Sequence, residues 1–186
     1  MLRIGFSGTG GVGKTTVLTA LMDKYPHLRK PISSARYVFE SKGITESHQK
    51  YMTDEALLDL QEEITGHWLK QFSDINEDSI WDRTLLDHYA YGMVRNHKYV
   101  DKNWIAKREQ SVRFNLESYT HFFFFPQSKT WEPKPDSLRD PSPGTRKLVD
   151  LTMQGYLTNY SGTVYYVPTD ESPEKVVEFV LNIISQ

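Results

Sequence analysis

Eight residues near the amino terminus decide the fold: Gly8-Thr9-Gly10-Gly11-Val12-Gly13-Lys14-Thr15. They match the phosphate-binding loop G-x-x-x-x-G-K-[ST] at every fixed position. The apolar run 2–6 before the loop is typical of a buried strand, and residues 16–22 after it can continue as a helix. Strand, glycine loop and helix in this order are the context in which the motif binds phosphate, which favours a site over a chance glycine-rich turn.

The residue types in this loop predict which ligands it binds. Glycines allow positive φ and close backbone approach, so successive amide N–H groups can surround a phosphate. The Lys14 ammonium would reach the β- and γ-phosphates of ATP, and the Thr15 hydroxyl would hold Mg²⁺. We therefore expect ATP and Mg²⁺ as ligands, with ATP contacts from the residues Gly10, Gly11, Val12, Gly13, Lys14, Thr15 and Thr16.

Composition narrows the class of protein. A chain of 186 residues predicts one domain, residues 1–186. The absence of cysteine agrees with a reducing, cytoplasmic setting. A formal net charge of −2 does not indicate a large nucleic-acid surface, and no apolar run is long enough to span a membrane. The expected strand at the start leaves no room for a signal peptide.

Apolar patterning predicts five strands that alternate with helices. The strands are expected at 2–6, 30–32, 79–81, 121–126 and 163–167, and the helices at 14–25, 54–72, 84–97, 105–119, 147–159 and after Ser172. The aromatic run 121–126 is typical of a central parallel strand buried on both faces. This order predicts a three-layer α/β/α P-loop NTPase fold with a five-stranded parallel sheet.

Polar residues that follow the strands are candidates for a second ligand, because open α/β sheets bind ligands beyond the carboxyl ends of their strands. Ser33 to Phe39 follows the second strand, and Asp82 and Arg83 follow the third. Asp82 can hold the Mg²⁺ shell or accept the proton of an acceptor hydroxyl, and Arg83 can clamp an anion. Asp87 lies one helical turn later, near the same site. A role in the site and a solvated carboxylate on the helix surface are equally good interpretations of this residue.

The proline-rich segment 127–147 predicts a lid, since long irregular loops inside compact domains commonly cover active sites. Arg139 and Arg146 flank its end and could place positive charge on the γ-phosphate in the transition state. The alternative is a solvated loop with incidental charge.

Three separated pieces resemble the small P-loop nucleoside and nucleotide kinases. They are the loop 8–15, the segment Trp81-Asp82-Arg83-Thr84-Leu85-Leu86-Asp87-His88-Tyr89-Ala90-Tyr91, and Asp136-Ser137-Leu138-Arg139-Asp140. The sequence is most similar to the NadR-type (ribosylnicotinamide kinase-like) group, and more distantly to thymidylate kinases. The group's Asp-Arg-x-x-x-Asp-x-x-Ala-Tyr pattern is matched at Asp82, Arg83, Asp87, Ala90 and Tyr91, and its lid arginine at Arg139. One departure is Ser34, where the group commonly carries a carboxylate.

The resemblance implies transfer of the ATP γ-phosphoryl group to a nucleoside-like acceptor. Lys14, Asp82, Arg83 and Arg139 would be catalytic, Thr15 and Asp82 would hold Mg²⁺, and Arg139 and Arg146 would contact ATP. The acceptor would contact the residues Ser34, Arg36, Tyr37, Phe39, Gln61, Arg83 and Asp87. The arginine pair Arg36 and Arg83 favours an acceptor that already bears a phosphate, hence a (deoxy)nucleoside monophosphate.

Other functions stay open at this point. The acceptor could be a nucleoside, or a hydroxymethylated base in DNA, although the modest charge argues against strong duplex binding. A non-kinase P-loop NTPase is a rival class, but the Asn-Lys-x-Asp guanine reader is absent and a motor's second subdomain has little room. A nucleotide-binding regulator without turnover is another, and a homodimer is also open.

Overall fold

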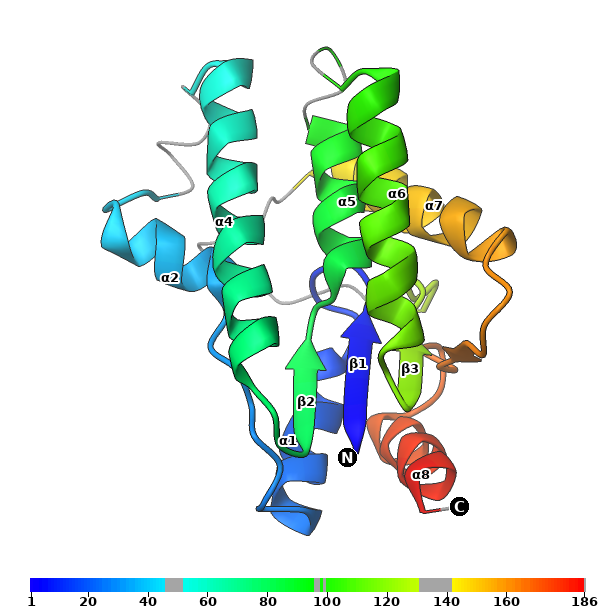
Figure 1. Ribbon diagram of the computed structural model, residues 1–186. Helices are drawn as coiled ribbons and strands as arrows, with labels where there is room; N and C mark the ends of the chain where they lie inside the picture. Colours follow the sequence, from blue (N-terminus) through cyan, green and yellow to red (C-terminus); the bar gives the residue numbers. More distant parts are fainter. Residues whose placement is uncertain (46–51, 96–97, 99, 131–141, 186) are drawn as a thin grey trace.

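A parallel sheet forms the centre of the protein in the computed structural model, which describes residues 1–45, 52–95, 98, 100–130 and 142–185 (Figure 1). Its strands are β1 (Arg3–Ser7), β2 (Ser79–Asp82), β3 (His121–Phe124) and β4 (Tyr165–Tyr166). They lie in the order β2-β1-β3-β4, and every pair is parallel. The predicted α/β class and parallel sheet are confirmed, whereas the predicted count of five strands is wrong among the described residues.

The expected strand at 30–32 is the one that the structure does not contain. Only Arg29 pairs with β2: its N–H donates to Asp78 O at 2.8 Å, and its carbonyl accepts from Ile80 N at 2.9 Å. Pro31 has no N–H to donate, so the ladder cannot continue through it. The chain therefore pairs with the outer edge of β2 only through an isolated β-bridge between Arg29 and Ser79.

Seven helices surround the sheet in the described ranges. They are α1 (Lys14–Lys24), α2 (Ser34–Ser41), α4 (Asp54–Asp74), α5 (Leu85–Arg95), α6 (Lys102–Glu117), α7 (Pro143–Thr158) and α8 (Pro173–Ile184). The predicted caps are present, because the Thr53 side chain accepts from Ala56 N and the Ser172 side chain accepts from Lys175 N. Helix α2 was not expected from the pattern. No helix in the described part of the chain could cross a membrane.

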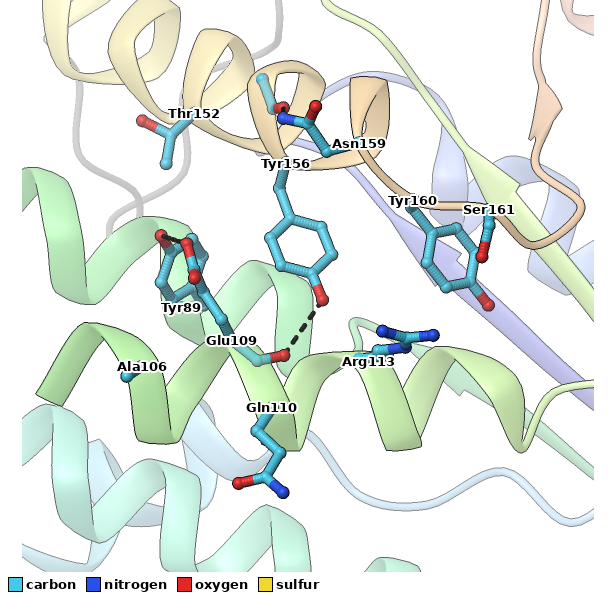
Figure 2. Close-up of a pocket in the computed structure, with 11 residues that line it drawn as sticks. Tyr89, Ala106, Glu109, Gln110, Arg113, Thr152, Tyr156, Asn159, Tyr160 and Ser161 are labelled. Atoms are coloured by element: carbon cyan, nitrogen blue, oxygen red, sulfur yellow. Dashed lines mark hydrogen bonds between the residues drawn. The ribbon is translucent and has the colours of Figure 1, made fainter. Parts of the chain in front are cut away.

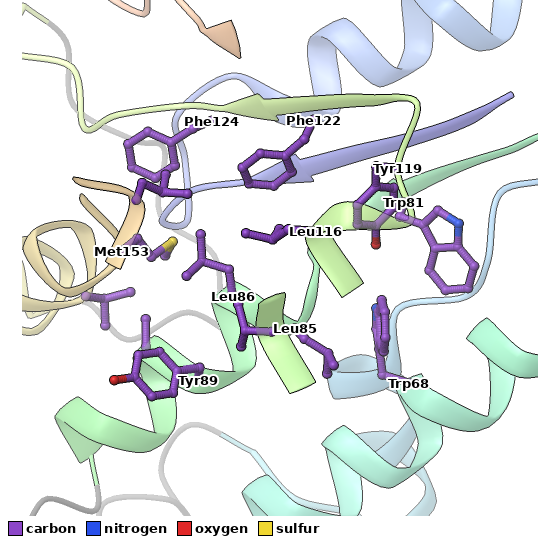
Figure 3. Close-up of a cluster of buried hydrophobic side chains, with 14 residues drawn as sticks. Trp68, Trp81, Leu85, Leu86, Tyr89, Leu116, Tyr119, Phe122, Phe124 and Met153 are labelled. Carbon is purple, nitrogen blue, oxygen red and sulfur yellow. The ribbon is translucent and has the colours of Figure 1, made fainter. Parts of the chain in front are cut away.

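Alternating residues of the strands fill two separate cores. Ile4, Phe6 and Phe123 face one side, where they pack with side chains of α1 and α8. Phe122 and Phe124 face the other side, where α5, α6 and α7 cover them, and the cluster extends to Trp68 of α4 (Figure 3). The aromatic run is thus buried on both faces of the sheet, as the sequence predicts.

The register of β1 and β2 brings two loops to one edge of the sheet. Phe6 of β1 pairs with Asp82, the last residue of β2. The glycine loop follows β1 and the Arg83 turn follows β2, so both begin at neighbouring carboxyl ends. Helices α4, α5 and α6 extend beyond this edge of the sheet in Figure 1.

Candidate active site

The glycine loop has backbone angles that L-residues with side chains rarely adopt. Gly8, Gly11 and Gly13 have φ of 146°, 78° and 89°. A Cβ on Gly8 would also lie 2.4 Å from the carbonyl oxygen of Phe125. Gly13 caps α1, so the amides of Lys14 and Thr15 lie in the first turn beside the loop, whereas Thr16 N already donates to Gly13 O at 3.1 Å. Such amides form an anion-binding helix start.

Lys14 is buried inside the loop. It is only 6% exposed, and its Nζ donates to Gly8 O at 2.7 Å and Thr9 O at 2.8 Å. These contacts hold the ammonium beside the amides that would bind phosphate. Thr15 is exposed on the first turn of α1, whereas the side chain of Val12 lies in the core, which leaves Val12 only its backbone for a ligand.

The turn after β2 is strained and tied to β1. Arg83 is a non-glycine residue with φ of 89°, a conformation that costs free energy and persists only where neighbours hold it. Its N–H donates to Phe6 O at 2.9 Å, and its carbonyl accepts from Trp68 Nε1 at 3.2 Å. Backbone strain of this kind is concentrated at functional sites.

Asp87 joins the glycine loop to this turn. Its buried carboxylate accepts from Gly8 N at 3.2 Å, Thr84 N at 3.0 Å and Arg83 Nη1 at 3.1 Å. Burial opposes the charge of Arg83, but Tyr91 and the carboxylates of Asp87 and Asp82 outweigh it and raise the pKa of Arg83. The guanidinium is therefore a fixed positive charge at the edge of the loop. Asp87 orients Arg83, and all three of these bonds go to protein groups.

A pocket opens beside Arg83, between α2, α4 and the end of β2. Its lining combines apolar walls with a few polar groups, as small-molecule sites do, but its volume of about 30 Å³ is far below theirs, so a nucleoside-sized ligand would have to widen it. The lining residues are Pro31, Ile32, Ser33, Ser34, Ala35, Trp68, Trp81, Asp82, Arg83 and His88. The structure therefore brings the predicted residues Ser34, Asp82 and Arg83 into one pocket, next to the loop that contains Lys14. We call it the acceptor pocket.

Other predicted acceptor contacts lie outside this lining. Phe39 is buried in a small core between α2 and α4, so its ring supports packing. Tyr37 is 49% exposed and stacks on His67, with ring centroids 4.2 Å apart. Arg36 is exposed on α2. Gln61 lies behind the pocket, where its Nε2 is 3.4 Å from His88 Nδ1.

The lid prediction is only partly covered by the structure. Arg139 lies outside the described residues. Residues 143–147, at the end of the predicted lid, belong to α7, where Arg146 has a buried Nε with no hydrogen bond among the residues described. At the start of the lid, Ser128 Oγ and Lys129 N both donate to Asp170 Oδ1, at 2.9 and 2.7 Å.

Three residues of this region were missed from the sequence. His67 Nδ1 lies 3.0 Å from Ser34 Oγ, and Gln71 Nε2 donates to the same hydroxyl at 3.1 Å. His88 lines the acceptor pocket, and burial, reinforced by Arg83 and Arg108, lowers its pKa to about 3. His67 and Gln71 lie four residues apart on α4, so their shared polar face was the available signal.

Comparisons with solved structures reveal the same fold in kinases. Deoxyadenosine kinase from M. mycoides, with the products dCMP and a flexible dCDP bound, has a TM-score of 0.74 at 16% identity. The match covers 99% of this chain and 98% of the kinase chain. Thymidylate kinase from Candida albicans has a TM-score of 0.66 at 17% identity, covering 99% and 91%. NadR in complex with NR has a TM-score of 0.67 at 13% identity, covering 100% and 52%.

These likenesses confirm, for the fold, the resemblance to small P-loop nucleoside and nucleotide kinases. No curated protein matches the sequence. A family profile described as an AAA domain, AAA_28, matches residues 3–175, a span that includes the glycine loop and the Asp82–Arg83 turn. The chain therefore belongs to this AAA-domain family and has the fold of the small P-loop nucleotide kinases.

Proposed function

We propose that the protein transfers the γ-phosphoryl group of ATP to a nucleoside-type acceptor bound in the acceptor pocket. The observation that carries this proposal is the position of Asp82 and Arg83. They line the pocket, and the three hydrogen bonds of Asp87 tie their turn to Gly8 of the glycine loop. The γ-phosphate of ATP and the acceptor would then lie side by side. Enzymatic phosphoryl transfer depends mainly on this positioning and on charge stabilisation, and little on covalent catalysis.

The donor side fits a nucleoside triphosphate with Mg²⁺. The loop amides and Lys14 would bind the phosphates, and the Thr15 hydroxyl and the Asp82 carboxylate are hard oxygen donors of the kind Mg²⁺ takes. The ion would neutralise charge that develops on the phosphate oxygens. Arg83 supplies a second, protein-borne charge there, and Arg139 of the segment outside the described residues is proposed as a third.

A (deoxy)nucleoside monophosphate is the first candidate acceptor. Arg83 at the pocket edge can bind a phosphate through its fork of donors. Arg36 is exposed on α2 outside the pocket lining, and its side chain would have to turn inward to reach the same phosphate. The apolar wall formed by Trp68 and Pro31 suits the flat face of a base.

A nucleoside hydroxyl is the second candidate, and Asp82 is the observation that favours it. This carboxylate lines the acceptor pocket, where it could accept the proton that an attacking hydroxyl must lose. A phosphate acceptor is already an anion and needs no such base. Asp87 also offsets part of the charge of Arg83.

The test is a screen with γ-labelled ATP and Mg²⁺ against nucleosides, nucleoside monophosphates and DNA containing hydroxymethylated bases. We expect transfer to one class of monophosphate, and its loss in Lys14→Ala with the fold retained by circular dichroism. Transfer to DNA alone, or no transfer to any acceptor despite Mg-ATP binding, would overturn the proposal in favour of a DNA kinase or a regulator. A wild-type rate in Lys14→Ala would show that the site is elsewhere.

A further inference from the structure

A second cavity lies between α6 and α7, apart from the acceptor pocket (Figure 2). Its volume of about 690 Å³ is within the range of small-molecule sites. The lining residues are Tyr89, Ala106, Glu109, Gln110, Arg113, Thr152, Gly155, Tyr156, Asn159, Tyr160 and Ser161. None of them lines the acceptor pocket or belongs to the glycine loop.

Aromatic faces form one side of this cavity. The rings of Tyr156 and Tyr160 project from the end of α7 toward α6 (Figure 2). Burial raises the pKa of Tyr156 to about 12 and also raises the pKa of Tyr160, so both phenols stay protonated. Gly155 adds no side chain, and a Cβ there would meet no atom within 4 Å. Two flat neutral rings beside an open space suit a planar ring.

Charge in the cavity comes from two residues of α6. Arg113 is the single cation in the lining and Glu109 the single carboxylate. Glu109 Oε1 accepts from Tyr89 OH at 3.1 Å, which directs this carboxylate toward α5. Arg113 acts electrostatically on both Tyr156 and Tyr160, so its guanidinium lies near both rings. Arg113 Nε also donates to Glu117 Oε1 at 3.0 Å, but the two side chains are 64% and 45% exposed. Exposed ion pairs of this kind are weak, so an anionic group could compete with Glu117 for the guanidinium beside the aromatic faces.

We propose that the cavity binds a mononucleotide as an effector, with the base against Tyr156 and Tyr160 and the phosphate on Arg113. The side-chain amides of Gln110 and Asn159 would bind the polar edge of the base. This proposal goes beyond the transfer reaction, because the ligand is regulatory and its site shares no residue with the acceptor pocket.

Hydrogen bonds connect the cavity to the helices that carry the active site. Tyr89 of α5 donates to Glu109 Oε1, and Tyr156 of α7 donates to the backbone carbonyl of Glu109 at 3.1 Å. Helix α5 begins directly after the turn that bears Arg83, and it contains Asp87. A ligand between α6 and α7 would act on α5 and α7, which is the physical basis for coupling to transfer.

Hydrogen–deuterium exchange of the whole 186-residue chain without ATP tests the proposal, with AMP, dCMP and dTMP as probes. We expect at least one probe to protect residues 106–113 and 152–161. Arg113→Gln and Tyr160→Ala should each weaken that binding at least tenfold in parallel calorimetric titrations. Lys107→Gln removes the same charge from an exposed position of α6 outside the cavity and should bind the probe as the wild type does.

Protection of the cavity that is lost in Arg113→Gln and kept in Lys107→Gln supports the proposal. Absence of protection with all three nucleotides, or equal protection in Arg113→Gln, overturns it. A wild-type affinity in both cavity variants also overturns it. If instead the proposed transfer reaction is wrong, the screen with γ-labelled ATP gives no labelled product while a nucleotide still protects the cavity helices from exchange. The two failures are therefore distinguishable.

Discussion

At the scale of the residue, Asp87 has an environment unlike that of the surface ion pairs. The carboxylate is 1% exposed and accepts from two backbone amides and the Arg83 guanidinium. Lys175 and Glu171 form a pair with the same i,i+4 spacing, but their side chains are 66% and 50% exposed. Removing one member of a buried pair leaves polar groups without partners, whereas exposed pairs contribute little.

Asp87→Asn should therefore lower the free energy of unfolding by about 2–3 kcal/mol, because the new amide turns a donor toward N–H groups that need an acceptor. Glu171→Gln should change it by less than about 0.5 kcal/mol. Urea denaturation of both variants and the wild type measures the difference. Equal small losses would mean that Asp87 does not hold the Arg83 turn.

His88 predicts an acid sensitivity whose sign follows from its pKa. Burial, with Arg83 and Arg108, lowers the pKa of folded His88 from 6.5 to about 3. Between these values the unfolded chain binds a proton that the folded protein excludes, so stability falls as the pH decreases from about 6.5 toward 3. The contribution is up to about 1.4 kcal/mol per pH unit.

His88→Gln should flatten the fall in stability between about pH 6 and pH 4. Urea midpoints of the variant and the wild type, collected across the pH range, measure the two slopes, and a wild-type slope in His88→Gln would contradict the assignment.

At the scale of the element, the joint between β1 and α1 depends on glycine geometry. Gly8→Ala would introduce a Cβ 2.4 Å from the Phe125 carbonyl at φ of 146°. Because that neighbour is backbone, the clash cannot be relieved by a rotamer change. We expect a loss of about 3 kcal/mol or more in the free energy of unfolding, and weaker ATP binding.

Gly66→Ala is the matched control. Gly66 lies inside α4, and a Cβ there would meet no atom within 4 Å. The same substitution should stabilise the protein by about 0.5–1 kcal/mol, since alanine loses less backbone entropy in a helix. Opposite signs of the two changes in urea denaturation are the expected result. Destabilisation by both would point to a general intolerance of alanine.

At the scale of the whole molecule, Mg-ATP should link the loop, α1 and β2 into one stabilised unit. A ligand at about 100 times its Kd adds about 2.7 kcal/mol, which corresponds to about 5–10 °C in Tm for a protein of this size. Chelation of Mg²⁺ by EDTA should remove part of this shift. Thr15→Ala should remove the same part, because we propose that its hydroxyl holds the ion.

Differential scanning calorimetry with ATP, with and without EDTA, measures this effect in the wild type and in Thr15→Ala. Thr19→Ala is the control, since this threonine lies one turn later on α1 and its hydroxyl donates to Thr15 O. An identical shift with and without EDTA would contradict the assignment of Mg²⁺ to this site.

Local signals were sufficient for most of the elements, but not for α2 or the edge of the sheet. The spacing of apolar residues and the capping residues Thr53 and Ser172 predicted α4 and α8 because helix ends and faces depend on neighbours in sequence. The glycine loop was predicted because its backbone angles require glycine at fixed positions. The expected strand at 30–32 was wrong because Pro31 removes a ladder donor, an effect that outweighs apolar content.

What the sequence by itself determined is the α/β fold, the parallel sheet and the position of the phosphate-binding loop, since each depends on short-range pattern. Only the tertiary structure decided that Asp87 binds Gly8 across 79 positions of sequence, that Phe39 belongs to packing, and that His88 lines the pocket. The reason is physical: burial and hydrogen-bond partners are set by which segments the sheet register brings together, and no local pattern contains that information.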